Sequence, residues 1–158
     1  MTKPAGPAPG DPAPGFTLPA PGGAFSLTGR EGRKTVLYFY PKDDTPGCTT
    51  EALDFTREAA AFEAADTLVV GISRDSVAKH EKFIGKHGLG VILASDEDGA
   101  VTEAYGVWVE KNMYGRTYMG IERATFLIDR AGIVRRVWRK VKVKGHVAEV
   151  LAGARALD

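Results

Sequence analysis

Cysteine is nearly absent from this sequence, because Cys48 is the only one among 158 residues. A single cysteine excludes an internal disulfide, a zinc site built from clustered cysteines and every mechanism that needs a Cys-x-x-Cys pair. A chain without disulfides is typical of a reducing compartment. We therefore expect a cytoplasmic protein, and nothing in the sequence points to a cofactor or a metal ion.

Long apolar runs are also missing. No stretch approaches the roughly 20 apolar residues that span a membrane, and residues 1–7 lack the apolar region of a secretory signal. The formal net charge is only +1, so total charge favours no nucleic-acid partner. We expect a protein with no membrane contact.

Proline is scarce beyond the start of the chain, since seven of the nine prolines lie within residues 4–21. This segment cannot form a helix, and we expect residues 1–11 to be a loose arm. The other two prolines, Pro41 and Pro46, both lie shortly before Cys48. The length suits a single domain, which we expect to cover residues 1–158.

The distribution of apolar residues predicts an α/β fold. Nearly continuous apolar runs predict strands covered on both faces at residues 36–40, 68–72, 91–93 and 124–128. Helical patterns occupy residues 46–63, 76–87, 99–105 and 145–157. Further strands are expected at 133–143, paired with 124–128, and in an N-terminal β-hairpin of 16–18 and 24–27. This order predicts a central mixed β-sheet flanked by helices.

The segment from Thr45 to Cys48 lies where a strand is expected to give way to a helix. Thr45 is a favourable N-cap and Pro46 suits the first helical position, so Cys48 is the third helical residue. Free backbone N–H groups and the helix dipole at this position lower the pKa of a cysteine below its usual value of about 8.5. A lone cysteine on an apolar helix face is often only a small buried side chain. The position directly after a cap, at the end of a strand, favours a functional role.

The residues Phe39 to Glu51 closely resemble the active-site segment of peroxiredoxins, Pro-x-x-x-Thr-x-x-Cys. The resemblance is greatest to the Q type, also called bacterioferritin comigratory protein, and a second stretch from Tyr114 to Asp129 matches the same type. Similarity extends from about Pro12 to the last helix. It implies a thioredoxin-like fold and a peroxidase that is regenerated by a thiol.

The resemblance also implies a role for each matching residue. Cys48 resembles the peroxidatic cysteine, Thr45 the hydroxyl that binds the peroxide, and Pro41 the residue that shields the thiolate from water. Arg123 resembles the arginine that holds the thiolate and the reacting oxygens, and Glu51 the carboxylate that positions this arginine. Chemistry agrees, because fixed donors such as a guanidinium stabilise the charge that develops when a peroxide bond breaks.

One position departs from the family pattern. Many Q-type members have a resolving cysteine five residues after the first, where this chain has Leu53. We therefore expect a one-cysteine enzyme that reduces hydrogen peroxide and organic hydroperoxides in antioxidant defence. An external thiol would resolve its sulfenic acid, and thioredoxin, glutaredoxin and low-molecular-weight thiols all stay open. A monomer or weak homodimer is expected.

Two rival functions were weighed. A basic cluster with interleaved apolar residues consists of Arg135, Arg136, Arg139, Lys140, Lys142 and Lys144. Such a cluster could bind nucleic acid. The solvated face of an edge strand explains it better. A cysteine hydrolase would need a histidine base. His80, His87 and His146 fall in helical patterns with no evident tie to Cys48, so we expect them to be ordinary helix residues.

Overall fold

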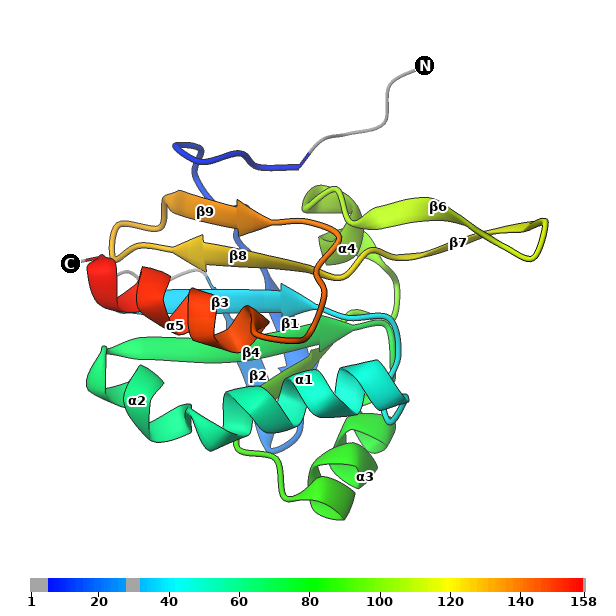
Figure 1. Cartoon of the computed structure of the whole chain (residues 1–158), viewed down its shortest axis with the longest axis horizontal. Coiled ribbons are helices and arrows are strands. Elements are labelled where there is room, and N and C mark those ends of the chain that lie inside the picture. The colour runs from blue at the N-terminus through cyan, green and yellow to red at the C-terminus, as the bar shows by residue number, and fades with distance from the viewer. Residues whose placement is uncertain (1–5, 28–31, 158) are drawn as a thin grey trace.

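The computed structural model describes residues 6–27 and 32–157, and a five-stranded sheet lies at its centre (Figure 1). In spatial order, the strands are β5 (Ile92–Ser95), β4 (Thr67–Ser73), β3 (Lys34–Phe39), β8 (Ala124–Ile128) and β9 (Val134–Trp138). The first three are parallel to one another, whereas β8 and β9 are added in antiparallel fashion. The predicted mixed sheet is confirmed, although β5 is an edge strand rather than a central one.

The helices follow the predicted order. They are α1 (Pro46–Arg57), α2 (Ala59–Ala64), α3 (Val77–His87), α4 (Ala100–Ala104) and α5 (His146–Ala156). The helix predicted over residues 46–63 is divided at Glu58 into α1 and α2. The limits of α3 match their sequence signals, because the Ser76 hydroxyl accepts the Lys79 N–H at its start and Gly88, with φ of 63°, ends it.

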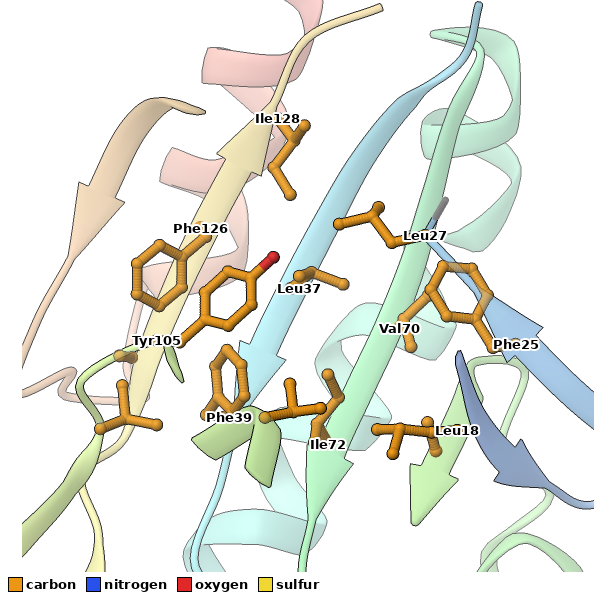
Figure 2. Close-up of a cluster of buried hydrophobic side chains, with 14 of the residues drawn as sticks. Leu18, Phe25, Leu27, Leu37, Phe39, Val70, Ile72, Tyr105, Phe126 and Ile128 are labelled. Atoms are coloured by element: carbon orange, nitrogen blue, oxygen red, sulfur yellow. The ribbon is translucent and has the colours of Figure 1, made fainter. Parts of the chain in front are cut away.

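Strand β3 explains why its sequence is apolar throughout. Leu37 and Phe39 point into one core, and Val36 and Tyr38 point into another on the opposite face of the sheet. The first core (Figure 2) is closed by the predicted N-terminal hairpin of β1 (Thr17–Ala20) and β2 (Gly23–Ser26), which contributes Leu18 and Phe25. Helices cover the second core, and Cys48 belongs to it. The sheet therefore holds the cysteine on its helical face.

A buried lysine joins the start of β3 to the C-terminal end of α5. Lys34, the first residue of β3, is only 3 % exposed. Its ammonium group donates to the carbonyl oxygen of Ala154 at 2.7 Å and to that of Leu157 at 2.9 Å. These carbonyls lie at the C-terminal end of α5, where helix carbonyls lack partners within the helix. Lys34 thus caps α5 from the central sheet.

The prediction of a loose arm is wrong for residues 6–11; residues 1–5 lie outside the described part of the chain. Gly10 N–H donates to the Val134 carbonyl at 2.7 Å, and Val134 N–H donates to the Asp11 carbonyl at 2.9 Å. A Cβ at Gly6 would lie 2.1 Å from the carbonyl oxygen of Tyr105, so this glycine also packs closely. Proline prevents a helix here but leaves enough N–H groups to pair with the edge of the sheet.

A projecting hairpin escaped the sequence analysis. It consists of β6 (Trp108–Met113) and β7 (Arg116–Ile121), which pair antiparallel and extend beyond the sheet (Figure 1). Tyr114 and Gly115 turn the chain with φ values of 53° and 77°, as a two-residue hairpin loop requires. Most of its side chains are exposed on both faces, so no alternation of apolar and polar residues marks its strands.

The strand predicted over residues 133–143 is shorter than expected. Strand β9 ends at Trp138, and Lys140 adopts a left-handed φ of 49°. Both Arg139 and the Lys140 N–H bind the carboxylate of Glu122. This local hydrogen bonding diverts the chain from the sheet, so only part of the basic cluster lies on an edge strand.

Candidate active site

Cys48 is located in the first turn of α1, as predicted. Thr45 has the extended backbone of an N-cap (φ −91°, ψ 156°), Pro46 is the first helical residue, and the Thr49 N–H bonds the Thr45 carbonyl at 2.8 Å. The Thr45 hydroxyl does not cap the helix, however, because it donates to the Lys42 carbonyl at 2.9 Å. The predicted side-chain cap is therefore wrong. The N–H groups of the first turn stay available for negative charge at Cys48.

Arg123 joins Cys48 to Glu51. It lies between β7 and β8, and its Nη2 donates to Sγ of Cys48 at 3.4 Å while Nη1 donates to Oε1 of Glu51 at 2.6 Å. Cys48 and Glu51 are three positions apart on α1, so they share one helix face. Cys48 is 2 % exposed and Glu51 is fully buried. The structure thus brings Arg123 against two residues of α1 that precede it by more than seventy positions, and the guanidinium is aimed at the sulfur.

Burial and paired charges compete at the ionisable groups of this cluster. It raises the pKa of Glu51 to about 7, against the charge and hydrogen bond of Arg123, which lower it. Burial would lower the pKa of Arg123, but the negative charges of Glu51 and Cys48 outweigh it and raise that pKa. Arg123 therefore remains a cation. Among the described residues, nothing bonds Oε2 of Glu51, so this carboxyl group lies close to the balance between its charged and neutral forms.

Gly47 and Pro41 complete the predicted surroundings of Cys48. A Cβ at Gly47 would lie 3.2 Å from Nη2 of Arg123. The sequence suggested that Gly47 leaves room for a substrate, but in the structure the guanidinium uses that room. Pro41 is exposed in the loop between β3 and α1. Its predicted shielding of the thiolate remains a prediction.

A buried polar network behind this loop was not predicted from the sequence. His80 of α3 contacts Asp43 at 2.6 Å, and the Tyr40 hydroxyl donates to the same carboxylate at 2.5 Å. On the outer side, Lys86 and His87 of α3 bind Asp44 at 2.8 Å each. The signal was present as polar residues directly after an apolar strand, but their partners lie more than thirty residues away. Only the fold reveals that α3 holds the loop.

His146 and the basic cluster make contacts of their own outside the group of Cys48, Glu51 and Arg123. His146 bonds the hydroxyl of Thr125 at 2.8 Å, and burial lowers its pKa to about 4. In the basic cluster, Arg135 pairs with Asp129 at 3.2 Å. Within residues 6–27 and 32–157, no helix is long and apolar enough to cross a membrane, and no group of three His, Cys, Asp or Glu residues could hold a metal ion.

Comparison with known proteins identifies this arrangement. Residues 9–137 match the AhpC/TSA family. The chain belongs to the AhpC/TSA family. It is 51 % identical to peroxiredoxin Bcp of Bacillus subtilis over 130 residues. This match covers 82 % of this chain and 83 % of the relative. It is 48 % identical over 148 residues to peroxiredoxin Bcp of Xanthomonas campestris, covering 92 % of each chain.

Solved structures agree with these relatives. Peroxiredoxin Q of Xanthomonas campestris superimposes with a TM-score of 0.85 at 48 % identity, over 89 % of this chain and 90 % of that one. The resemblance to Q-type peroxiredoxins and the thioredoxin-like fold are both confirmed. The protein is an AhpC/TSA peroxiredoxin, a thiol-dependent peroxidase. That Xanthomonas protein has been solved with cysteine-to-serine mutations at two different positions, so it has at least two cysteines, whereas this chain has one.

Proposed function

We propose that the Cys48 thiolate is the nucleophile that attacks the peroxide. The sulfur bonds to the terminal oxygen of a hydroperoxide, the O–O bond breaks, and the leaving hydroxide or alkoxide takes a proton to become water or an alcohol. Cys48 becomes a sulfenic acid, so sulfur is oxidised by two electrons and the peroxide is reduced by two. The observation that carries the proposal is the Arg123 guanidinium, which reaches Sγ of Cys48 at 3.4 Å.

The neighbouring residues have separate roles in this proposal. Arg123 stabilises the thiolate and the charge that develops on the oxygens, because it is a fixed donor in a buried site. Glu51 acts through Arg123 and holds its guanidinium in place. The Thr45 hydroxyl would bind the peroxide and Pro41 would limit access of water, the roles that the family resemblance implies for these positions.

The substrates proposed are hydrogen peroxide and organic hydroperoxides. A structural study of the Xanthomonas campestris relative concerns its alkyl peroxide reduction activity, which supports the organic substrates. Leu53, at the position where the resemblance implies a resolving cysteine in many Q-type members, packs against the second core. A first external thiol would form a mixed disulfide with Cys48 and release water, and a second thiol would then free Cys48 as a disulfide forms between the two reductant sulfurs.

The proposed reductant is an external thiol, and the proposed assembly is small. Thioredoxin, glutaredoxin and low-molecular-weight thiols can each supply the two thiols that a turnover consumes. A reducing cytoplasm contains all three, which supports a cytoplasmic location. We propose a monomer or a weak homodimer, because Cys48 needs no second copy to complete its surroundings. Sedimentation at several protein concentrations measures this directly.

A comparison of the parent protein with Cys48→Ser tests the proposal. Hydrogen peroxide consumption should depend on an added thiol in the parent and disappear in the variant, while the circular dichroism spectra stay the same. A dimedone-type probe should label Cys48 after one equivalent of peroxide. Consumption that persists in the variant would overturn the assignment of Cys48.

A further inference from the structure

His80 of α3 is held in a buried position by two hydrogen-bond partners. The whole residue is shielded from solvent. Its Nδ1 lies 2.6 Å from Oδ2 of Asp43, and its Nε2 lies 3.0 Å from the carbonyl oxygen of Ala94. Neither ring nitrogen of this imidazole faces a donor from the described residues, and this determines where its protons lie.

A carbonyl oxygen can only accept, so Nε2 of His80 must carry a proton. The carboxylate of Asp43 also only accepts, and its other oxygen already receives the Tyr40 hydroxyl at 2.5 Å. An imidazolium paired with an Asp43 carboxylate satisfies both contacts with two N–H donors, whereas a protonated Asp43 would instead donate to an unprotonated Nδ1. The 2.6 Å separation is that of a charge-assisted hydrogen bond. Because every polar atom of the pair is bonded, the pair meets the condition under which buried ions are tolerated.

The Asp43 end of this pair belongs to the loop between β3 and α1. The Asp43 N–H donates to Oδ2 of Asp75 at 2.8 Å. Asp75 is itself fixed by the hydroxyl of Ser73 at 2.7 Å, and its carbonyl accepts the hydroxyl of Ser95 at 2.6 Å. Ser73 and Ser95 end the neighbouring strands β4 and β5. Asp43 is thus tied to α3 through its side chain and to the sheet through its backbone.

The next residues of the chain lead directly into α1, which carries Cys48. Asp44 turns the backbone with φ of 61°, and Thr45 follows as the N-cap of α1. We propose that His80, as a buried imidazolium, is a positioning residue that fixes the loop from Pro41 to Thr45 in its peroxide-binding conformation. Its kinetic consequence rests on the function proposed above, whereas its charge state is independent of that function.

Nuclear magnetic resonance of protein labelled with ¹⁵N-histidine tests the charge state. Both His80 ring nitrogens should give the shifts of protonated nitrogens in the parent protein. His146 is the internal control, since it is also buried but contacts a hydroxyl and should show one bare nitrogen. In Asp43→Asn, the amide can donate to Nδ1, so His80 should lose one ring proton. An unprotonated His80 ring nitrogen in the parent, or His80 ¹⁵N shifts that are unchanged in Asp43→Asn, would overturn the proposal.

The positioning role is tested by comparing two reactions of Cys48. In His80→Gln, the rate constant for peroxide should fall about tenfold or more, because a displacement near 1 Å costs that much or more in a preorganised site. Alkylation by iodoacetamide does not use the peroxide-binding loop, and its rate should change less than twofold. His87→Gln is the matched control, since it removes an exposed contact of the same helix with the same loop.

The outcomes separate the two proposals. If the parent does not react with peroxide, the proposed function fails. If the parent reacts and His80→Gln reacts equally fast, the positioning role fails. An equal loss in peroxide reaction and alkylation would also overturn it, because that result means a general disturbance of Cys48. Should His80→Gln fail to fold, the same two rates in Asp43→Ala decide, because this variant removes the side-chain tie of the loop to α3; the peroxide rate constant should again fall about tenfold or more, and an unchanged rate would overturn the positioning role.

Discussion

Gly47 and Arg123 compete for the same small volume, because a Cβ on Gly47 would lie 3.2 Å from Nη2 of the guanidinium. Arg123 in turn is held by Glu51 and can retreat only by weakening its bond to that carboxylate or to Cys48. The glycine in the first turn of α1 is therefore a requirement of the arginine. Helix formation alone would favour another residue there.

Gly47→Ala should accordingly separate stability from activity. Alanine stabilises a helix by up to about 1 kcal/mol relative to glycine, so the free energy of unfolding should be unchanged or higher. The peroxide rate constant should fall because the new methyl group displaces the guanidinium. Stopped-flow oxidation and urea unfolding measure the two quantities. Gly85→Ala in α3 is the control, because a Cβ there would meet nothing within 4 Å. It should raise the free energy of unfolding and leave the peroxide rate constant unchanged.

Arg123→Ala should lower the peroxide rate constant by about a hundredfold or more, the usual loss when one preorganised donor is removed from a developing charge. Its effect on stability should be smaller, since Glu51 can be neutralised by a proton once its partner is gone. Arg123→Lys keeps the charge but loses the fork that bonds two groups, so an intermediate rate is expected. If Arg123→Ala reacted as fast as the parent, the guanidinium would have no part in the chemistry.

Glu51→Gln should change how stability depends on pH. The folded-state pKa of Glu51 is about 7, above its ordinary value of 4.5, because of burial. Between these values the folded protein binds more protons than the unfolded chain, so stability falls as pH rises from about 4.5 to 7. The loss is up to about 3 kcal/mol. Glutamine cannot ionise, and the variant should lack this loss in urea unfolding at pH 5 and pH 8.

The parent must serve as the reference for that measurement, because His146 acts in the opposite direction. Burial lowers its pKa from 6.5 to about 4. The unfolded chain then binds more protons between these values, so this residue makes stability rise with pH over that window. The difference between parent and Glu51→Gln isolates the carboxyl group. Equal pH profiles for the two proteins would mean that Glu51 is ionised throughout.

Thr45→Val should reduce peroxidase activity with little effect on stability. The sequence suggested that this hydroxyl both caps α1 and binds peroxide, which would make the variant hard to interpret. In the structure it bonds the Lys42 carbonyl and caps nothing. Thr45→Ser should retain the rate, since it keeps the hydroxyl. A stability loss in Thr45→Val as large as that of a true N-cap, about 1 kcal/mol, would contradict this assignment.

Oxidation by one equivalent of peroxide should yield a monomer heavier by one oxygen. Leu53, five residues after Cys48, is rotated about 140° from it around an ideal helix, and it packs against the second core. Unwinding the helix would expose this side chain with no disulfide to form, so we expect α1 to stay folded. Excess peroxide should then produce some sulfinic acid. Intact mass spectrometry, with Cys48→Ser as control, decides; a quantitative disulfide-linked dimer would show that resolution occurs between subunits.

Local signals in the sequence predicted much of the site and fold. The cap, proline and cysteine that begin α1 are adjacent, and the apolar runs of β3, β4 and β8 reflect burial on both faces. Family resemblance predicted Arg123 and Glu51, which local patterns alone would leave as a surface arginine and a helix-start acid. Their contact depends on the sheet bringing the end of β7 beside α1, which no local pattern encodes.

The features that the sequence did not predict are stabilised by residues that are distant in the chain. His80 looked like an ordinary residue of an amphipathic helix, because its partner Asp43 lies 37 positions earlier. The hairpin of β6 and β7 is exposed on both sides, so burial left no periodic trace in its sequence. Residues 10–13 are ordered by pairing with β9, and their own composition only excludes a helix. In each case the stabilising partner is distant in the chain.

The ammonium group of Lys34 has a consequence for how the chain can be shortened or extended. Its two acceptors, Ala154 and Leu157, lie in the last turn of α5, and the lysine begins the strand that leads to the loop before Cys48. Deleting residues 154–158 would leave a buried cation without acceptors at the start of that strand. The C-terminal turn is thus part of the same cooperative unit as the reactive thiol, and fusion partners belong beyond Asp158, joined by a linker that leaves this turn intact.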